Sequence, residues 1–285
     1  MNNPADANKV KAMLEEYGFT FSKGLGQNFL TDAEVCPRMA RCAQLDAQTG
    51  VIEIGAGAGV LTAELCRAAG KVVTFEVDKR LLPVLARTLE GFNNVTVINA
   101  DILKIDLKEL IEREFKGMRV CVCANLPYYI TSQIIMLLLE SRLPIDTVTV
   151  MVQAEAAQRL CAHTGERDGG AITAAVNYYS EPERMFFVDR SCFMPSPKVD
   201  SEVIRLKVRK EPAVAVKDEK AMFRVIKAAF AQRRKTAVNS ISGSLGVPKA
   251  SVAQVLDALG LDPSVRAERL TLKNFADISA ALGEG

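Results

Sequence analysis

Four consecutive residues, Asn125-Leu126-Pro127-Tyr128, bring together groups that suit a flat substrate bearing an amine. They follow the apolar run 119–124, which predicts a buried strand, and Pro127 must end that strand because proline has no N–H to donate. An amide, backbone carbonyls and an aromatic ring are therefore expected at the carboxyl end of a strand, where open α/β sheets place their ligands. The oxygens can accept amine hydrogens and the ring can stack on a base. A plain turn at the end of a strand is the alternative interpretation.

A glycine-rich turn lies between a short apolar strand and a helical pattern that begins at Val60. Glycine lets a turn tighten and lets a ligand approach bare backbone, and the following helix adds free N–H groups at its positive end. The G-x-G-x-x-G dinucleotide fingerprint fails, because Val60 stands where its third glycine is required. The spacing Glu53-x-Gly55-x-Gly57-x-Gly59 instead resembles the first motif of class I S-adenosylmethionine-dependent methyltransferases. A structural glycine turn in another doubly wound enzyme is the alternative.

Acidic residues follow the next two predicted strands, 72–75 and 95–98. Glu76 stands about twenty residues past the glycines, where an acid accepts hydrogen bonds from both ribose hydroxyls of a nucleotide. This position fits NAD and S-adenosylmethionine equally well. Asp101 is placed to accept from an adenine amine, with a capping or turn aspartate as the alternative. Asp78 is predicted to cap the next helix.

The elements that must position these residues follow from alternating strand and helix patterns, which predict a parallel, doubly wound α/β sheet. Its strands are expected near 51–54, 72–75, 95–98, 119–124 and 146–152. Two further apolar runs, 184–188 and 203–208, are expected to complete the sheet as an antiparallel edge pair.

Composition limits the kind of protein and its compartment. With 285 residues, of which 49% are hydrophobic and 25% charged, the chain can build one large domain or two smaller ones. It has neither a membrane-length apolar stretch nor a signal-peptide pattern, and its seven cysteines lie mainly in apolar segments. We therefore expect reduced thiols in a cytoplasmic protein. The only histidine is His163, which argues against a metal site and against histidine-dependent nucleophilic catalysis.

A linker at 210–213 marks the predicted boundary between a domain at 1–209 and a small all-helical domain at 210–285. Apolar residues beyond it, such as Met222, recur with helical spacing. From residue 209 onward there are 13 Lys+Arg against 8 Asp+Glu, a net charge of +5, which leaves −3 for the first 208 residues. This asymmetry predicts contact with a polyanion near the C-terminal part.

Five blocks in order resemble one family, the ribosomal RNA adenine N6,N6-dimethyltransferases in their bacterial small-subunit form. The blocks are Gly24-Leu25-Gly26-Gln27-Asn28-Phe29-Leu30, the glycine turn, Asn125 to Tyr128, Phe193 to Ser201, and Ala229 to Thr236. The resemblance runs from about residue 18 to the end. It implies a class I S-adenosylmethionine-dependent methyltransferase fold, with a Rossmann-like seven-stranded sheet and a small helical C-terminal domain.

The resemblance also implies that S-adenosylmethionine is the methyl donor and that no metal takes part. The donor-binding residues that it implies are Asn28 and Leu30 near the methionine part, Gly55 beside the donor backbone, Glu76 on the ribose, Asp101 on the adenine, and Asn125 between donor and target.

On the target side, the Asn125 side chain and the Leu126 carbonyl are expected to accept the two amine hydrogens of adenine. Pro127 makes the turn, and Tyr128 stacks on the base. Phe193 is expected to close the other face of the base, with a plain core aromatic as the alternative. An aryl amine needs position and polarisation rather than a strong base, because its proton can leave after transfer. The adenine must leave its stack to reach such a pocket.

The basic residues expected to bind RNA phosphates are Arg233, Arg234 and Lys235, with Arg224, Lys227 and Lys220 nearby and Lys207, Arg209 and Lys210 as an extension. A solvated helix face is the alternative interpretation. The implied partners are small-subunit ribosomal RNA and the small ribosomal subunit, bound by a monomer with no membrane contact. One departure from the family is Ala154, where members often have lysine, and Tyr129 receives no role.

The implied reaction is methyl transfer to two adjacent adenosines near the 3′ end of small-subunit ribosomal RNA, with a role in subunit maturation. Three other readings stay open. One is a related enzyme acting on large-subunit RNA, which the Gln232-Arg233-Arg234-Lys235 pattern disfavours. Another is a noncatalytic RNA-binding or assembly factor, and the third is an NAD oxidoreductase, which Val60 disfavours.

Overall fold

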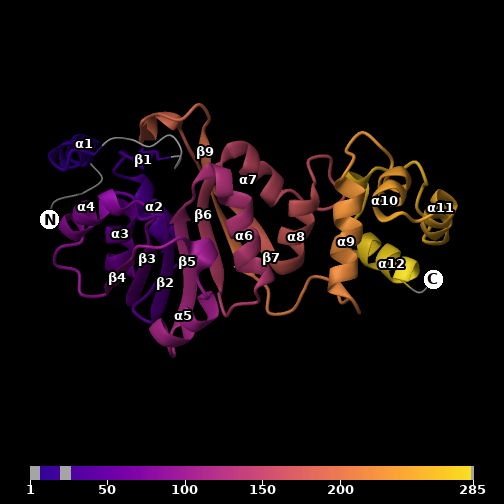
Figure 1. The fold of residues 1–285 in the computed structure, drawn as a ribbon, viewed down its shortest axis with the longest axis horizontal. Helices are drawn as coiled ribbons and strands as arrows, with labels where there is room; N and C mark the ends of the chain where they lie inside the picture. The colour runs from indigo at the N-terminus through magenta and orange to yellow at the C-terminus, as the bar shows by residue number, and fades with distance from the viewer. Residues whose placement is uncertain (1–6, 20–26, 284–285) are drawn as a thin grey trace. The chain divides into compact units, whose positions relative to one another are not determined.

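The computed structural model describes residues 7–19 and 27–283 and contains a seven-stranded sheet (Figure 1). The strand order is β4-β3-β2-β5-β6-β9-β7. The strands are β2 (Thr49–Ile54), β3 (Lys71–Phe75), β4 (Val95–Ile98), β5 (Arg119–Asn125), β6 (Thr147–Gln153), β7 (Ser180–Val188) and β9 (Ser201–Val208). Strands β2 to β6 pair in parallel, and β9 is antiparallel to β6. The predicted doubly wound, seven-stranded sheet is confirmed, and β9 lies between β6 and β7.

One helix precedes the parallel strands and another follows each of them, and all of these helices have buried residues. They are α2 (Val35–Cys42), α3 (Val60–Ala68), α4 (Leu82–Thr88), α5 (Leu107–Glu114), α6 (Thr131–Glu140) and α7 (Ala154–Cys161), with α1 (Ala7–Glu16) before them. Short turns of 3₁₀ helix stand at η2 (Lys79–Leu81), η3 (Ile102–Lys104), η4 (Tyr128–Ile130) and η5 (Arg190–Cys192). Every residue of β2 is buried, as expected for a parallel strand covered on both faces.

The strand register gathers the predicted site residues at one edge. The order of the strands reverses between β2 and β5, which is the switch point where open α/β sheets bind ligands. Ile54 lies opposite Phe75, and Phe75 lies opposite Ile98, so the residues that follow β2, β3 and β4 meet at the same carboxyl edge.

A second sheet of two short strands joins distant parts of the chain. Strand β1 (Phe29–Leu30) pairs antiparallel with β8 (Phe193–Met194), and Leu30 lies opposite Phe193. Beside this pair, the N–H and hydroxyl of Thr31 both donate to the Cys192 carbonyl, at 2.9 and 3.1 Å. The sequence predicted neither strand, because two residues are too few to show a periodic pattern.

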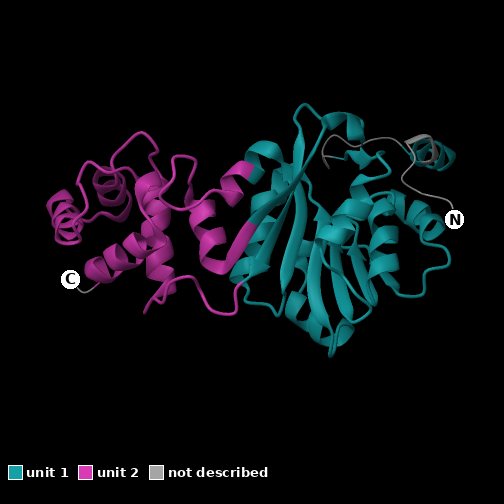
Figure 2. Ribbon diagram, turned by 180° about the vertical axis from the view of Figure 1, so that it is seen from behind, with its two compact units in different colours: residues 1–157, 183–208 teal, residues 158–182, 209–285 magenta. Residues whose placement is uncertain are grey.

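The chain divides into two compact units, residues 1–157 with 183–208 and residues 158–182 with 209–285 (Figure 2). The helices of the second unit are α8 (Ala171–Tyr179), α9 (Glu219–Phe230), α10 (Ala237–Leu245), α11 (Lys249–Ala258), η6 (Ala267–Arg269) and α12 (Leu272–Gly283). The predicted apolar face of α9 is buried, including Met222. Among the residues that the structure describes, no helix is long and apolar enough to cross a membrane.

The second unit differs from the division at residue 209 that the sequence suggested, because it includes 158–182. Side chains from α8 explain the difference. The hydroxyls of Tyr178 and Tyr179 both donate to the Glu219 carboxylate at the start of α9, at 3.2 and 2.5 Å. The ring of Phe223 stacks on Tyr179 with 5.6 Å between centroids. These contacts fix α8 to the C-terminal helices.

Candidate active site

A cavity of about 400 Å³ opens at the carboxyl edge of the sheet. Its walls come from the segment around β1, the glycine turn, the residues after β3, β4 and β5, and β8. All ten residues predicted for donor and target line it, namely Asn28, Leu30, Gly55, Glu76, Asp101, Asn125, Leu126, Pro127, Tyr128 and Phe193. Residues 24–26 of the first predicted block lie outside the described residues.

The glycine turn presents bare backbone to the cavity. Gly55 has a φ of +81° and Gly57 a φ of +58°, in the left-handed region that favours glycine. The Gly55 N–H donates to the Phe75 carbonyl at 2.8 Å, which fixes the turn against the end of β3. A Cβ on Gly57 would lie 3.3 Å from the Phe29 ring, so a side chain there would crowd the segment opposite.

Glu76 is a buried carboxylate held by backbone N–H groups. Its Oε2 accepts from the Gly57 N–H at 2.8 Å and its Oε1 accepts from the Asp78 N–H at 2.9 Å. Burial raises the pKa of Glu76, and the two N–H donors act in the opposite direction. A carboxylate oxygen can accept more than one hydrogen bond, so both oxygens can also receive hydroxyl donors from a ligand.

Asp101 has both of the features predicted for it, because it caps a helix and also lies at the ligand site. Its Oδ1 accepts from the Leu103 N–H at 3.0 Å and caps η3. The residue also lines the cavity. Within the described residues its Oδ2 has no hydrogen bond, which leaves an acceptor for a donor in the cavity.

In the turn after β5, some hydrogen-bond acceptors are occupied by other groups of the protein and others are not. The Leu126 N–H continues the strand ladder to the Met151 carbonyl at 3.2 Å. The Pro127 carbonyl accepts from the Ile130 N–H and from the Thr131 hydroxyl, both at 3.2 Å, and so starts η4. Across the described chain, neither the Asn125 side-chain amide nor the Leu126 carbonyl takes part in any hydrogen bond. Two adjacent acceptors are thus left at the cavity wall.

Tyr128 is fixed at its hydroxyl and leaves its ring beside those acceptors. Its Oη lies 2.6 Å from the Oγ of Ser201, the buried first residue of β9. Burial raises the pKa of Tyr128, and the Ser201 hydrogen bond opposes that shift. Phe193 is only 4% exposed and belongs to the hydrophobic core, yet it also lines the cavity. Both interpretations of Phe193 therefore fit its position. Tyr129, at the same wall, is 60% exposed.

A buried acid lies behind the glycine turn. The Oε2 of Glu53 accepts from the hydroxyls of Thr62 on α3 and Thr74 on β3, both at 2.6 Å. Its Oε1 is buried and has no hydrogen-bond partner in the described part of the chain. Burial raises the pKa of Glu53 to about 7. Glu53 thus links β2 to α3 and β3, and it does not line the cavity.

Sequence reasoning missed several cavity residues. Cys36, Val77 and Leu103 line it without having been singled out, whereas Gln27 stood in the first predicted block without a role of its own. A signal existed for two of them, because Val77 directly follows Glu76 and Leu103 follows Asp101 by two positions. The position of Cys36 depends on how the chain packs, and it had no such signal.

Five of the residues predicted to bind RNA lie in the second unit, on α9 and in the turn that follows it. They are Arg224, Lys227, Arg233, Arg234 and Lys235, and all five are exposed. Within the ranges that the structure describes, none of them forms an ion pair, so their charges are not neutralised by neighbouring acids.

The fold and the cavity together define a class I methyltransferase. A glycine turn follows β2, acids follow β3 and β4, the Asn-Leu-Pro-Tyr turn follows β5, and an antiparallel strand is inserted near the end of the sheet. The family model described as "Ribosomal RNA adenine dimethylase" matches residues 18–283. The chain belongs to this family, which makes it an enzyme that dimethylates adenine in ribosomal RNA. The resemblance drawn from the sequence is confirmed.

Named relatives cover nearly the whole chain. Ribosomal RNA small subunit methyltransferase A of Geobacillus thermodenitrificans (strain NG80-2) is 49% identical over 282 residues, 98% of this chain and 96% of the relative. The protein of the same name from Bacillus mycoides (strain KBAB4) is 46% identical over 286 residues, 99% of this chain and 98% of the relative.

Two solved structures are similar in fold. A dimethyladenosine transferase from Plasmodium falciparum superposes with a TM-score of 0.75 at 24% identity, covering 90% of this chain and 98% of that chain. The 23S rRNA methyltransferase ErmE superposes with a TM-score of 0.69 at 28% identity, covering 90% of this chain and 100% of that chain.

Proposed function

We propose that the protein transfers methyl groups from S-adenosylmethionine to the exocyclic amines of two adjacent adenosines near the 3′ end of small-subunit ribosomal RNA. The product is N6,N6-dimethyladenosine, and the reaction serves maturation of the small subunit. The observation that carries the chemistry is the pair of unused acceptors, the Asn125 amide and the Leu126 carbonyl, beside the ring of Tyr128. The relatives named as small-subunit methyltransferases support the choice of RNA.

The chemistry of the donor half fits S-adenosylmethionine. When bound, this donor supplies an electrophilic methyl group on a positively charged sulfur. Glu76 would accept from the ribose hydroxyls with the oxygens that already hold backbone N–H groups, and Asp101 would accept from the adenine amine with its unused Oδ2. The bare backbone of Gly55 gives the donor room to approach. Asn28 and Leu30 would contact the methionine part, and Asn125 would lie between donor and target.

The target half can polarise an aryl amine without a base. Two acceptors on adjacent residues, Asn125 and Leu126, would hold the two amine hydrogens and direct the nitrogen lone pair toward the methyl group. Pro127 fixes the turn that presents both. Tyr128 would stack on the base, and the cavity-lining edge of Phe193 would limit its other face. The amine proton leaves to water after each transfer, so positioning carries the catalysis.

RNA binding is assigned to the C-terminal residues 210–285, and methyl transfer to the domain before them. The five exposed cations Arg224, Lys227, Arg233, Arg234 and Lys235 support this, as does the charge excess of that part. Because such contacts release counterions, RNA affinity should fall steeply with salt, and replacing two of these cations should flatten the salt dependence by about two units of slope. The protein would act as a cytoplasmic monomer on ribosomal subunits.

One experiment tests donor, substrate and site together. The protein is incubated with radiolabelled S-adenosylmethionine and undermethylated small subunits, and the labelled nucleoside is then identified. Labelled dimethyladenosine from two neighbouring adenosines near the 3′ end, lost in Asn125→Ala, is the expected result. Unlabelled small subunits, with large subunits labelled in a parallel incubation, would overturn the choice of substrate. A protein that binds no S-adenosylmethionine would overturn the proposed donor.

A further inference from the structure

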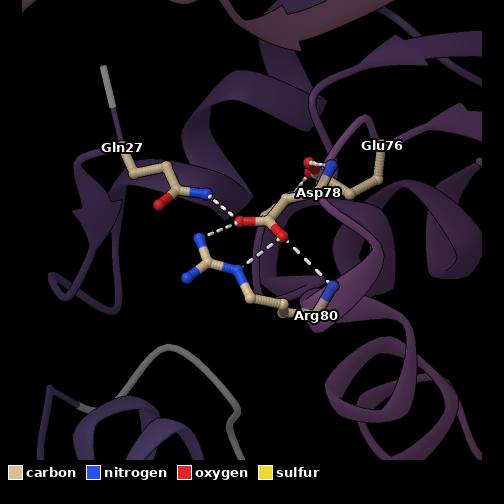
Figure 3. Close-up of polar contacts among 5 residues, drawn as sticks. Gln27, Glu76, Asp78 and Arg80 are labelled. Carbon is tan, nitrogen blue, oxygen red and sulfur yellow. Dashed lines mark hydrogen bonds and ion pairs between the residues drawn. The ribbon is translucent and has the colours of Figure 1, made fainter. Parts of the chain in front are cut away.

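Asp78 makes more contacts than a helix cap needs (Figure 3). It is 7% exposed and caps η2, with Oδ1 accepting from the Arg80 backbone N–H at 3.1 Å. The Arg80 side chain donates to Oδ1 from Nε at 2.9 Å and to Oδ2 from Nη2 at 2.6 Å. Oδ2 also accepts from the Gln27 side-chain amide at 2.8 Å. Gln27 is 51 residues away in the sequence, so this bond is tertiary and not part of the cap.

Asp78 is also joined to the donor half of the cavity. Its N–H donates to Glu76 Oε1 at 2.9 Å, and Glu76 Oε2 accepts from the Gly57 N–H at 2.8 Å. A continuous series of hydrogen bonds therefore runs from Gln27 through Asp78 and Glu76 to Gly57. Gln27, Glu76 and Gly57 all line the cavity, whereas Asp78 does not.

The segment 27–30 is held by contacts at both of its ends. Leu30 pairs with Phe193 in the small sheet, and Gln27 is bound by Asp78. Asn28, which lines the cavity, lies between these two points. If the Gln27 contact is lost, one restraint beside Asn28 is removed, and the segment gains conformational freedom that donor binding must then remove.

The charge on Asp78 is permanent at working pH. The hydrogen bonds from the Arg80 side chain lower the pKa of Asp78 to about 2, and the bond from Gln27 acts in the same direction. Arg80 is half exposed and supplies the opposite charge, so a second carboxylate can stand beside Glu76. Asp78 is therefore a constant acceptor and not a pH switch.

We propose that Asp78 is a positioning residue for the donor. It holds Gln27, and through Gln27 it keeps Asn28 against the donor site. Losing it weakens donor binding without impairing the methyl-transfer step. This inference rests on the proposed function, because it takes the ligand of this cavity to be S-adenosylmethionine.

The test compares Gln27→Ala and Asp78→Ser in the full-length protein. Serine can still cap η2, but its single short oxygen cannot hold both Arg80 and Gln27. Calorimetric titration with S-adenosylmethionine should give about tenfold weaker binding for each variant, because a hydrogen bond with one charged partner has that order of strength. The donor KM should rise similarly, and kcat at saturating donor should stay within twofold.

The matched control is Asp218→Ser, the same change at the N-cap of α9 in the second unit. It removes a carboxylate that accepts from the Ala221 N–H at 2.9 Å and lies outside the cavity lining. The Asp218→Ser variant should unfold at a lower temperature because it has lost a helix cap, while its affinity for the donor stays unchanged. This separates positioning from a general loss of stability.

Coupling between the two residues decides the matter. Because both changes break the same bond, the double variant should bind donor no more weakly than Asp78→Ser alone. Losses that multiply, or a Gln27→Ala variant with unaltered donor affinity, would overturn the positioning role. Absence of donor binding by the parent protein would instead overturn the proposed function, so the two failures are distinguishable.

Discussion

The donor half and the target half of the cavity are built in opposite ways. In the donor half, Glu76 is already hydrogen bonded by Gly57 and Asp78 before any ligand arrives. In the target half, the Asn125 amide and the Leu126 carbonyl make no hydrogen bond within the described residues. Because the same donor is bound for every transfer, its site can be preorganised, which reduces the cost of binding. The target half keeps its acceptors for an amine that changes from one transfer to the next.

This contrast predicts a separation of effects. Changes in the target half should reduce the rate of transfer or weaken RNA binding, and leave donor affinity intact. Changes in the donor half should reduce donor affinity, or alter the stability of the elements that carry it, and leave the rate at saturating donor intact.

The largest effect is expected from Asn125→Ala in the target half. Removing an acceptor that acts mainly in the transition state should lower kcat by roughly 100- to 1000-fold. Donor affinity, measured by calorimetry, should change by less than about threefold, since Glu76 and Asp101 are untouched. A large loss of donor affinity with little change in kcat would place Asn125 in the donor half.

A change of stability with pH is expected from Glu53, which supports the donor half from behind. Its pKa is about 7 in the folded protein against 4.5 in the unfolded chain, so the folded state holds a proton that the unfolded state has lost. Its contribution to the free energy of unfolding is full below pH 4.5 and is lost as pH rises to about 7.

Glu53→Gln should remove this dependence. Relative to the parent, the variant should gain on the order of 3 kcal/mol in unfolding free energy between pH 4.5 and pH 7.5, as measured by denaturant unfolding. If the free energy of unfolding changes with pH in the same way in both proteins, Glu53 is ionised in the folded protein.

A smaller effect is expected from Glu76→Gln. Losing a charged acceptor for hydroxyl donors should weaken donor binding by about 10- to 100-fold, with kcat at saturating donor within about threefold. Because burial raises the pKa of Glu76, donor binding in the parent should weaken on acidification at a higher pH than for a free glutamate. Unaltered donor affinity in the variant would remove Glu76 from the site.

The smallest effect is expected from the bond between Tyr128 and Ser201. Tyr128→Phe and Ser201→Ala each lose one neutral hydrogen bond that fixes the stacking ring, so the KM for RNA should rise roughly two- to tenfold. The double variant should be no worse than either single one. Additive losses would show that the two hydroxyls act separately.

The sequence predicted the positions of the seven strands and of the donor acids, because both follow local rules. Apolar runs identify strands, and the acid after a strand lies at the ligand-binding edge whatever the rest of the fold does. Asp101 illustrates the limit of such rules, because its cap is visible from the sequence while its second oxygen is seen only in the structure.

Contacts between distant segments could not be predicted in this way. The pairing of β1 with β8, the bond from Gln27 to Asp78 and that from Tyr128 to Ser201 each join segments more than 50 residues apart. The place of 158–182 in the second unit likewise depends on hydroxyls of α8 meeting a carboxylate on α9. No periodicity within either segment encodes such a meeting.

The small sheet also determines how late during synthesis of the protein the donor site can be completed. Thr31 and Cys192, which flank it, are 161 residues apart, so the segment that borders the donor site stays without its partner strand until residue 194 has been translated. At about 5–20 residues per second, that delay is roughly 10 to 30 s. A nascent chain can therefore form β2 to β6 early, yet it gains a complete donor site only when synthesis of the first unit is almost finished.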